Sequence, residues 1–434
     1  MCDLQHEVLN EEQNSWEPSM AVEARVSVLQ MGSFTSATKV ANEDAEDPDV
    51  CLPSQMTREA LIERCRWEHS HLPPLIQRNF RRISPTQVQS SSNDYWTSAL
   101  RCVPLSRVCS SLPGPNHIRV LQWNVLSQAL GQENDNFVCC PGEALEWQTR
   151  RFQMLEEILH SNPDIICLQE VDHFGFLYKA LSCVGYAGTF FPKPDSPCLY
   201  VPGNNGPDGC AIFFKSEKFQ LMSIDTRILE VWRVQSNQVA ILAWLTVRET
   251  GDQLLVCTTH LKARKGALLS TLRNEQGRDL LEFVAKQALL VEGETGKQPP
   301  VILCGDFNAE PSEPVYTTIL SDKRLCLSSA YAQYPLDSEK GDMANGNCMQ
   351  QLREPPYTTW KVRESEGEVC HTIDYVFHSQ SSLLVESVLE FPSGEEIGPG
   401  RVPSLRYPSD HFSLVCDFHL LSTDAKRCTI KEKM

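Results

Sequence analysis

The segment PPVILCGDFNAEP, residues 299–311, places a carboxylate and an amide directly after a run of apolar residues. The run 301–304 is typical of a buried strand, and Gly305 and Pro311 are typical of a tight turn. Asp306 and Asn308 follow two positions apart, a spacing that directs both side chains to one side of a strand. One side chain can then orient water while the other donates to a phosphate oxygen. The segment therefore predicts a strand end that carries functional side chains, with a plain strand-ending turn as the alternative.

Apolar runs elsewhere in the chain end in polar residues in the same way. They lie at residues 118–127, 163–172, 253–264, 371–379 and 409–420. Residues 143–161 and 273–290 instead have apolar positions at helical spacing. This alternation predicts an α/β domain with buried strands inside and helices outside. The repeated polar strand ends indicate one site that is held by a rigid scaffold.

Three of these strand ends carry carboxylates or histidine suited to hydrolysis. Glu170 ends the run ICLQE with no lysine or arginine directly beside it. Magnesium prefers oxygen ligands and keeps several waters, so one or two carboxylates suffice to hold it. Asp374 in HTIDYVF and the neighbours Asp410 and His411 in YPSDHFSLV supply an acid–base pair, because a buried aspartate fixes the tautomer of a histidine. Taken singly, a surface glutamate and a structural histidine are the alternative interpretations.

Together these motifs resemble the endonuclease/exonuclease/phosphatase superfamily. The resemblance rests on QWNVL with Asn124, LQE with Glu170, GDFN with Asp306 and Asn308, IDY with Asp374, and SDH with Asp410 and His411, in the family's order. It implies an α/β fold in which a two-sheet β-sandwich is flanked by helices.

The resemblance also implies a role for each motif residue. Glu170 would bind Mg²⁺ and face the substrate, with Asp410 nearby as a second metal ligand. Asp306 would orient or deprotonate the attacking water. The scissile phosphate would be held by Asn124, Asn308 and His411, with Asp374 orienting His411.

A closer resemblance, over residues 118–418, is to the deadenylase-related branch of the superfamily. It rests on FPKP, NNGPDGCAIFF, SNQVAI, THLKAR and PPYTTWKVR. The leucine-rich repeats of the deadenylases are absent from the chain. This resemblance implies two candidate reactions, which are removal of the 2′-phosphate of NADP(+) and NADPH and removal of poly(A) from mRNA. It further suggests that Asn237 contacts the substrate near the phosphate.

The basic residues of these motifs help to choose between the two reactions. They are Lys193, His260, Lys262, Arg264, Lys361 and Arg363. In strands, residues 260, 262 and 264 would share one face, as would 361 and 363. Such compact clusters suit a dinucleotide with several phosphates, whereas poly(A) would need an extended basic groove with stacking aromatics. A solvated basic face is the alternative.

We therefore expect a magnesium-dependent NADP(H) 2′-phosphatase, with a poly(A)-specific 3′ exoribonuclease as the alternative. Tyr357 and Trp360 are candidates either for stacking on a base or for filling the core. A third hypothesis is a catalytically idle scaffold that binds RNA-decay proteins. The intact motif residues argue against this scaffold, because idle relatives typically lose one of them.

Charge divides the chain into parts. Residues 1–56 hold eleven acidic residues against Arg25 and Lys39, which predicts a disordered acidic tail. Residues 57–116 are expected to be a linker or docking segment, 117–421 the catalytic domain, with a polar loop at 336–354, and 422–434 a C-terminal tail. The net charge of -17 argues against a generic nucleic-acid binder.

The composition also indicates a compartment. The eighteen cysteines contain no C-x-x-C pair, as is typical of free thiols in a reducing environment. The chain has no run of eighteen apolar residues, so no membrane span is predicted. The first residues are acidic and do not resemble a leader peptide. We expect a cytoplasmic protein, and translation starts at Met20, Met31 or Met56 would give mitochondrial or other isoforms. The sequence indicates no oligomeric state.

Overall fold

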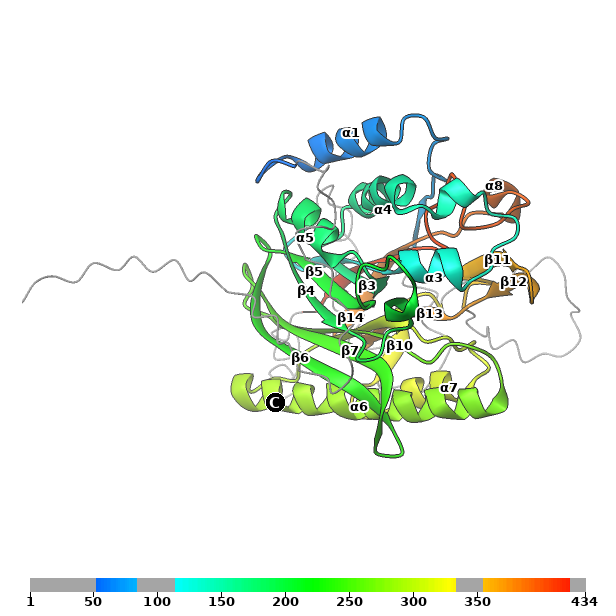
Figure 1. The fold of residues 1–434 in the computed structure, drawn as a ribbon. Helices are drawn as coiled ribbons and strands as arrows, with labels where there is room; N and C mark the ends of the chain where they lie inside the picture. Colours follow the sequence, from blue (N-terminus) through cyan, green and yellow to red (C-terminus); the bar gives the residue numbers. More distant parts are fainter. Residues whose placement is uncertain (1–51, 84–113, 333–353, 422–434) are drawn as a thin grey trace, which may run out of the picture. The chain divides into compact units, whose positions relative to one another are not determined.

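Two β-sheets packed face to face form the centre of the computed structural model (Figure 1). The structure describes residues 52–83, 114–332 and 354–421. The predicted acidic tail up to residue 51, most of the predicted polar loop and the predicted C-terminal tail lie outside the described residues.

The first sheet has seven strands within the described ranges, in the order β1-β14-β15-β2-β3-β5-β4. Strands β2 and β3 run parallel, and the other neighbours are antiparallel. In sheet order the strands are β1 Phe80–Arg82, β14 Leu383–Leu389, β15 Leu414–Leu420, β2 His117–Asn124, β3 Ile165–Val171, β5 Gly209–Lys215 and β4 Tyr186–Pro192.

The second sheet has six strands in the described chain, in the order β10-β13-β9-β8-β7-β6. Strands β8 and β9 are its parallel pair. The strands are β10 Leu327–Ser329, β13 Asp374–Ser379, β9 Val301–Asp306, β8 Gln253–His260, β7 Val234–Val247 and β6 Phe219–Val231. A separate antiparallel pair is formed by β11 Thr359–Arg363 and β12 Gly367–His371.

Apolar side chains from both sheets fill the space between them. Val120 and Ile165 of the first sheet share one buried cluster with Val256 and Ile302 of the second. Burying one such side chain contributes about 1.5–3 kcal/mol, so the layer between the sheets is a strong source of stability. It holds the strand ends in fixed positions.

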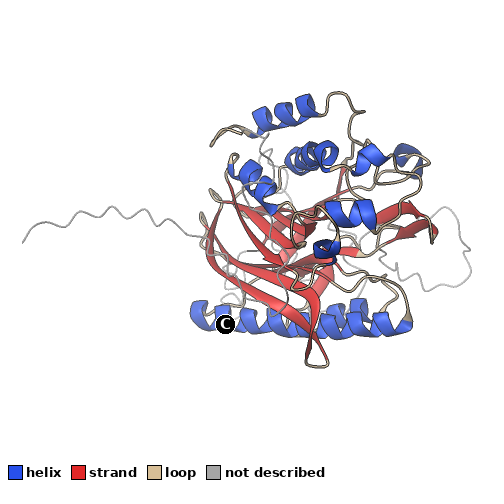
Figure 2. Ribbon diagram, in the orientation of Figure 1, coloured by secondary structure: helices blue, strands red, loops and turns tan. Residues whose placement is uncertain are grey.

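Helices cover the outer faces of the two sheets (Figure 2). Leu155 of α4 and Leu61 of α1 belong to one buried cluster with Leu168 of the first sheet, and Leu281 of α6 packs with Leu255 of the second. The helices are α1 Arg58–Glu68, α3 Gln128–Glu133, η4 Gly142–Leu145, α4 Trp147–Ser161, α5 Phe174–Ser182, η5 Pro197–Tyr200, α6 Ala267–Thr295, α7 Pro314–Leu320 and α8 Gly394–Ile397. Among the described helices, none is long and apolar enough to cross a membrane.

The predicted α/β fold of two sheets flanked by helices is confirmed. The described part of the segment 57–116 packs on this fold, since α1 contacts α4 and β1 extends the first sheet beside β14. One strand is shorter than predicted: β8 ends at His260, so the expected continuation through residues 261–264 is wrong. After this point the chain turns, and Leu261 donates its N–H to the carbonyl of Asp306.

The parallel pairs determine where a site can form. Carboxyl ends of parallel strands meet at one edge of a sheet. Asn124 at the end of β2 lies opposite Gln169 of β3, and Asp306 at the end of β9 lies opposite His260 of β8. Strand β2 of the first sheet packs on β9 of the second. The carboxyl ends of the two parallel pairs therefore lie close together, and their side chains can form one site.

Candidate active site

The amide of Asn124 connects the two sheets at this place. Its Nδ2 donates to Glu170 Oε1 at 2.9 Å and to Asp306 Oδ2 at 3.0 Å. The second Glu170 oxygen accepts from the backbone N–H of Ser127 at 3.1 Å. One buried amide therefore holds carboxylates from both sheets in fixed positions.

A break in the β3–β5 pairing aims Glu170 at the site. The register shifts between Leu168 and Val171, and Glu170 has a φ of 55°, in the left-handed region. A bulge of this kind redirects a side chain and is common beside active sites. A left-handed conformation at a glutamate costs energy and persists only where neighbouring contacts enforce it.

Asp306 and Asn308 are joined by a turn. Strand β9 ends at Asp306, and Asn308 has a φ of 50° beyond it, so the predicted strand alternation between the two is wrong. Asp306 Oδ1 instead accepts from the backbone N–H of Asn308 at 2.9 Å, and Asn308 Nδ2 donates to the Leu261 carbonyl at 3.1 Å. At Gly305, a Cβ would lie 2.5 Å from the Thr259 carbonyl, so only glycine allows the strands this approach.

His411 is held by a carboxylate on one ring nitrogen. Its Nδ1 lies 2.8 Å from Asp374 Oδ2, which also accepts from the Thr358 hydroxyl at 2.7 Å. The other nitrogen, Nε2, lies 3.8 Å from Asp306 Oδ2 and 3.7 Å from Asp410 Oδ2. Burial alone would lower the pKa of His411, but the Asp374 and Asp410 carboxylates outweigh it and raise the pKa to about 9. The ring is therefore positively charged at neutral pH.

Asp306 lies in an environment short of positive charge. Burial and the nearby Asp374 carboxylate raise the pKa of Asp306 to about 7, although His411 acts in the opposite direction. In the described chain, two imidazoles lie within 4 Å of its carboxylate, His260 at 3.6 Å and His411 at 3.8 Å, and only His411 is charged. A further cation at this place would favour the ionised carboxylate.

Strand β11 brings two basic side chains, Lys361 and Arg363, to the carboxylate of Asp410. Lys361 Nζ pairs with Asp410 Oδ2, and Arg363 lies 3.8 Å from the same oxygen. Arg363 also donates to Asp135 at 2.6 Å. Burial would raise the pKa of Asp410, but Lys361, His411 and Arg363 hold it well below its usual range. Residues 361 and 363 converge on one carboxylate, consistent with their spacing in a strand.

Lys193 lies beside His260, at the centre formed by the carboxylate and histidine side chains around Asp306. Its ammonium is buried, 2.5 Å from Asp208 Oδ2 and 3.4 Å from His260 Nδ1. Burial, Lys193 and His411 lower the pKa of His260, so this imidazole is neutral. It can therefore offer a lone pair to a ligand.

The structure does not gather every predicted residue at the centre. Lys262 and Arg264 are exposed in the loop after β8, so their predicted alternation with His260 in a strand is wrong. Asn237 on β7 accepts from the backbone N–H of Asp195 at 2.8 Å and donates to its carbonyl. These three residues lie on the loops and strand that surround the centre.

Two groups of side chains are close enough to share a metal ion. In each group the ligand atoms lie within 4.8 Å of one another, and the groups are Glu170, His260 and Asp306, and Asp306, Asp374 and His411. Asp410 is in neither group, and its carboxylate pairs with Lys361. The carboxylate oxygens of Glu170 and Asp306, with incomplete compensation of charge, fit a divalent cation.

Several side chains that shape the site were not predicted. Arg150 of α4 is fully buried and donates to the carbonyls of Val125, Leu126 and Pro408, at 3.1, 2.8 and 2.9 Å. It thereby ties the segment after Asn124 to the segment before Asp410. An arginine in an amphipathic helix gives no sign of this role in the sequence. Thr358 and Asp135 were also missed, and only Thr358 lies in a motif of the chain, PPYTTWKVR.

The fold and this centre define a class of protein. The profile of the Endonuclease/Exonuclease/phosphatase family matches residues 121–411, and the chain belongs to this family of hydrolases. Within the family it is a relative of nocturnin.

Nocturnin of Mus musculus is 46% identical over 359 residues, which cover 82% of this chain and 73% of that protein. Nocturnin of Drosophila melanogaster is 54% identical over 405 residues, which cover 91% of this chain, and the match spans only 61% of that longer protein. The solved catalytic domain of human Nocturnin with a bound sulfate anion is 38% identical and gives a TM-score of 0.58, covering 80% of this chain and 100% of that one.

Proposed function

We propose that the chain removes the 2′-phosphate of NADP(+) and NADPH in a magnesium-dependent hydrolysis that yields NAD(+) and NADH. The observation that carries the proposal is the pair of buried ammonium groups beside the carboxylate–histidine centre. Lys193 lies at His260 and Lys361 at Asp410, and both are more than nine-tenths buried. Buried cations strengthen the binding of phosphate oxygens. This compact arrangement suits a small substrate with several phosphates.

Glu170 and Asp306 are the residues that would hold magnesium, with Asp410 as the further ligand expected from the family resemblance. The bound ion supplies positive charge that stabilises the phosphate oxygens during the reaction. A sulfate anion is bound to the catalytic domain of human Nocturnin. Sulfate is tetrahedral like phosphate, which supports a phosphate site in this fold.

Asp306 is the residue that we assign to the attacking water. Its carboxylate can accept a proton from this water as a general base. The water oxygen bonds to phosphorus, and its proton passes to Asp306. The bond between phosphorus and the ribose 2′-oxygen breaks, and this oxygen takes up a proton as it becomes a hydroxyl group.

The remaining residues hold the phosphate. Charged His411, fixed by Asp374, donates from Nε2 to a phosphate oxygen and stabilises its negative charge. We assign the amides of Asn124 and Asn308 to the same group. Asn308 Nδ2 has one N–H besides its bond to the Leu261 carbonyl, whereas Asn124 would exchange a bond to Glu170 or Asp306 for one to the phosphate. Outside the centre, exposed Lys262 and Arg264 would contact the pyrophosphate of the dinucleotide, and Arg363 would assist Lys361.

The test supplies the purified chain with magnesium and either NADPH or a poly(A) oligonucleotide. Glu170→Ala serves as the blank, because it removes a metal ligand and leaves the fold in place. We expect phosphate release from NADPH and an oligonucleotide of unchanged length. Shortening of the oligonucleotide alone would replace this proposal with a poly(A)-specific exoribonuclease. Inactivity on both substrates would favour a scaffold for RNA-decay proteins.

A further inference from the structure

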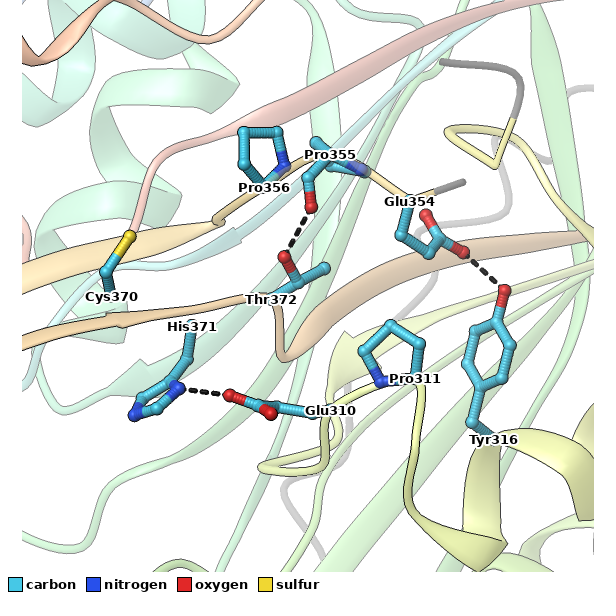
Figure 3. Close-up of a pocket in the computed structure, with 9 residues that line it drawn as sticks. All are labelled: Glu310, Pro311, Tyr316, Glu354, Pro355, Pro356, Cys370, His371 and Thr372. Carbon is cyan, nitrogen blue, oxygen red and sulfur yellow. Dashed lines mark hydrogen bonds and ion pairs between the residues drawn. The ribbon is translucent and has the colours of Figure 1, made fainter. Parts of the chain in front are cut away.

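A cavity of about 400 Å³ lies beside the centre, outside the residues assigned above (Figure 3). It is bounded by the loop after β9, helix α7, the segment 354–356 and the connection from β12 to β13. Glu310 of its wall follows Asn308 by two residues, and Thr372 precedes Asp374 by two. The cavity and the centre therefore share two stretches of backbone.

A hydrogen-bonded threonine connects this wall to the centre. The Thr358 N–H donates to the carbonyl of His371, which lines the cavity, at 2.8 Å. The Thr358 hydroxyl donates to Asp374 Oδ2 at 2.7 Å. The cavity wall at His371 is thus joined to Asp374 through a single residue, Thr358.

The lining combines apolar rings with carboxyl groups. Figure 3 shows the Glu310–His371 pair at one end and the Glu354–Tyr316 pair at the other, with Pro311 between them. Among the described residues that line the cavity, none is a lysine or an arginine. Among these described residues a phosphate group would meet the carboxyl groups of Glu310 and Glu354, and the His371 imidazole is already paired with Glu310. The cavity therefore selects an uncharged and largely flat group.

The same residues offer hydrogen bonds to such a group. The Glu310 carboxylate is an acceptor for an amine N–H. Burial raises the pKa of Glu354 to about 7, so its carboxyl group can donate as well as accept near neutral pH. A purine with an exocyclic amine presents donors and acceptors together on one flat edge.

The aromatic residues first considered for stacking on a base are engaged elsewhere. Tyr357 is buried and packs against Phe391 and Phe412. The Trp360 ring lies under the Arg401 guanidinium, 3.9 Å from it, and donates from Nε1 to Glu368. Neither ring lines the cavity. The cavity next to Asp374 is thus the better place for a base.

We propose that this cavity binds the nucleobase of the substrate, a neutral purine with an exocyclic amine, while the centre holds the neighbouring phosphoester. The inference rests on the proposed function, in which the phosphate is on the ribose 2′-oxygen. The base is attached to the adjacent ribose carbon, so it must lie close to that phosphate. The pyrophosphate is attached to the opposite end of the ribose, and in the proposed function it contacts Lys262 and Arg264.

Cys370 gives a direct probe of occupancy. Its thiol lines the cavity and is exposed, and Cys326 is an exposed thiol at the start of β10, outside the cavity. The experiment uses the Asp306→Asn variant, which keeps NADP(+) intact. Both thiols are labelled with iodoacetamide, and the rate of labelling of each is measured by peptide mass spectrometry. With NADP(+) at about ten times its Kd, Cys370 labelling slows about ten-fold, because only empty cavities react. Cys326 labelling is unchanged, and ribose 5-phosphate, which has no base, gives no protection.

An unchanged Cys370 rate at saturating NADP(+), or equal protection by ribose 5-phosphate, would overturn the assignment. Phosphate release by the unmodified enzyme is measured in a separate experiment. Failure of the phosphatase proposal can therefore be distinguished from failure of the base-site proposal. Release without protection rejects the base site, and protection without release rejects the phosphatase.

A second test fills the cavity. Cys370→Trp should raise the KM for NADP(+) about ten-fold by a steric clash, with a much smaller effect on kcat. Cys326→Trp is the matched control at an exposed thiol and should leave KM unchanged. An unaltered KM in a folded Cys370→Trp variant would contradict the base site.

Discussion

His411 Nδ1 lies 2.8 Å from Asp374 Oδ2, and Asp374 in turn is paired with Asp306 across neighbouring strands of the second sheet. One carboxylate therefore acts on the charge of two candidate catalytic groups. It raises the pKa of His411 by attraction and that of Asp306 by repulsion. The histidine is kept protonated while the aspartate is kept weakly acidic, which is the pairing that hydrolysis needs.

Replacement of Asp374 by asparagine removes this charge and leaves the shape of the side chain. We expect kcat to fall by about 10²–10⁴-fold, because His411 loses both its orientation and its charge. The alkaline limit of the pH profile of kcat should also move to lower pH, because the pKa of His411 falls when the Asp374 charge is removed. Thr358→Val, which removes one hydrogen bond to Asp374, should reduce kcat far less. Equal kcat in Asp374→Asn and the unmodified enzyme would contradict the assigned role.

The raised pKa of His411 predicts a pH dependence of stability in the metal-free protein. Its folded-state pKa of about 9 exceeds the ordinary value of 6.5. Charged His411 therefore stabilises the fold fully below pH 6.5, and this contribution is lost as the pH rises through 9. Denaturant unfolding in a chelator should show a decrease of at most about 3 kcal/mol over this range. His411→Gln should abolish the decrease, and an identical slope in that variant would rule out His411 as its source.

The raised pKa of Asp306 predicts that magnesium binding releases protons. At pH 6 the carboxyl group is mostly protonated, because its pKa is about 7, and a metal ligand must be deprotonated. Affinity should therefore increase by about ten-fold from pH 6 to pH 8. Isothermal titration calorimetry in buffers of different ionisation enthalpy measures the released proton. In Asp306→Asn the release should vanish, and a pH-independent affinity in the unmodified protein would contradict the prediction.

Arg150 is expected to support the site through stability. Arg150→Met leaves three buried carbonyls without their donor, and each such group costs about 1–3 kcal/mol. We expect a loss of at least about 3 kcal/mol in the free energy of unfolding, measured with urea. Arg278→Met is the control on the exposed face of α6 and should change it by less than about 0.5 kcal/mol. A loss in Arg150→Met no larger than in the control would contradict the account.

Arg264 is exposed and should act on binding alone. Arg264→Ala should raise the KM for NADPH about three- to ten-fold, because one charge near the pyrophosphate is lost, with little change in kcat. The effect should diminish at high salt, as expected for an exposed charge. Arg248→Ala removes an arginine that bonds the carbonyls of Ser216 and Phe219 and should leave KM unchanged. A fall in kcat with constant KM would place Arg264 at the chemical step instead.

Much of the fold could be predicted because strand ends leave a local signal. Asn124, Glu170 and Asp306 each follow an apolar run, and the contact of Asn124 with Glu170 follows from the parallel pairing of β2 with β3. The contact of Asn124 with Asp306 crosses between the two sheets, which the local sequence does not indicate. The backbone at Glu170 and Asn308 could not be predicted, because a positive φ in these residues is enforced by tertiary contacts. The position of Arg150 depends on carbonyls far apart in the sequence.

The loop after β8 shows the limit of strand alternation. Lys262 and Arg264 continue the pattern of His260 in the sequence, yet the strand ends at His260, where the chain turns toward α6. The Lys262 N–H donates to Gln276 of α6, a contact that the local sequence does not indicate. The cavity beside Asp374 was likewise missed, because its lining comes from four separate segments.

The central claim is that water attacks the 2′-phosphorus of NADP(+) at the centre formed by Glu170, Asp306 and His411. The most direct test is the reaction of NADP(+) with the purified chain and magnesium in ¹⁸O-labelled water, followed by mass spectrometry of all products. We predict one ¹⁸O atom in the released phosphate and unlabelled NAD(+). Cleavage of the pyrophosphate, label in NAD(+), or no release of phosphate from NADP(+) would contradict the account.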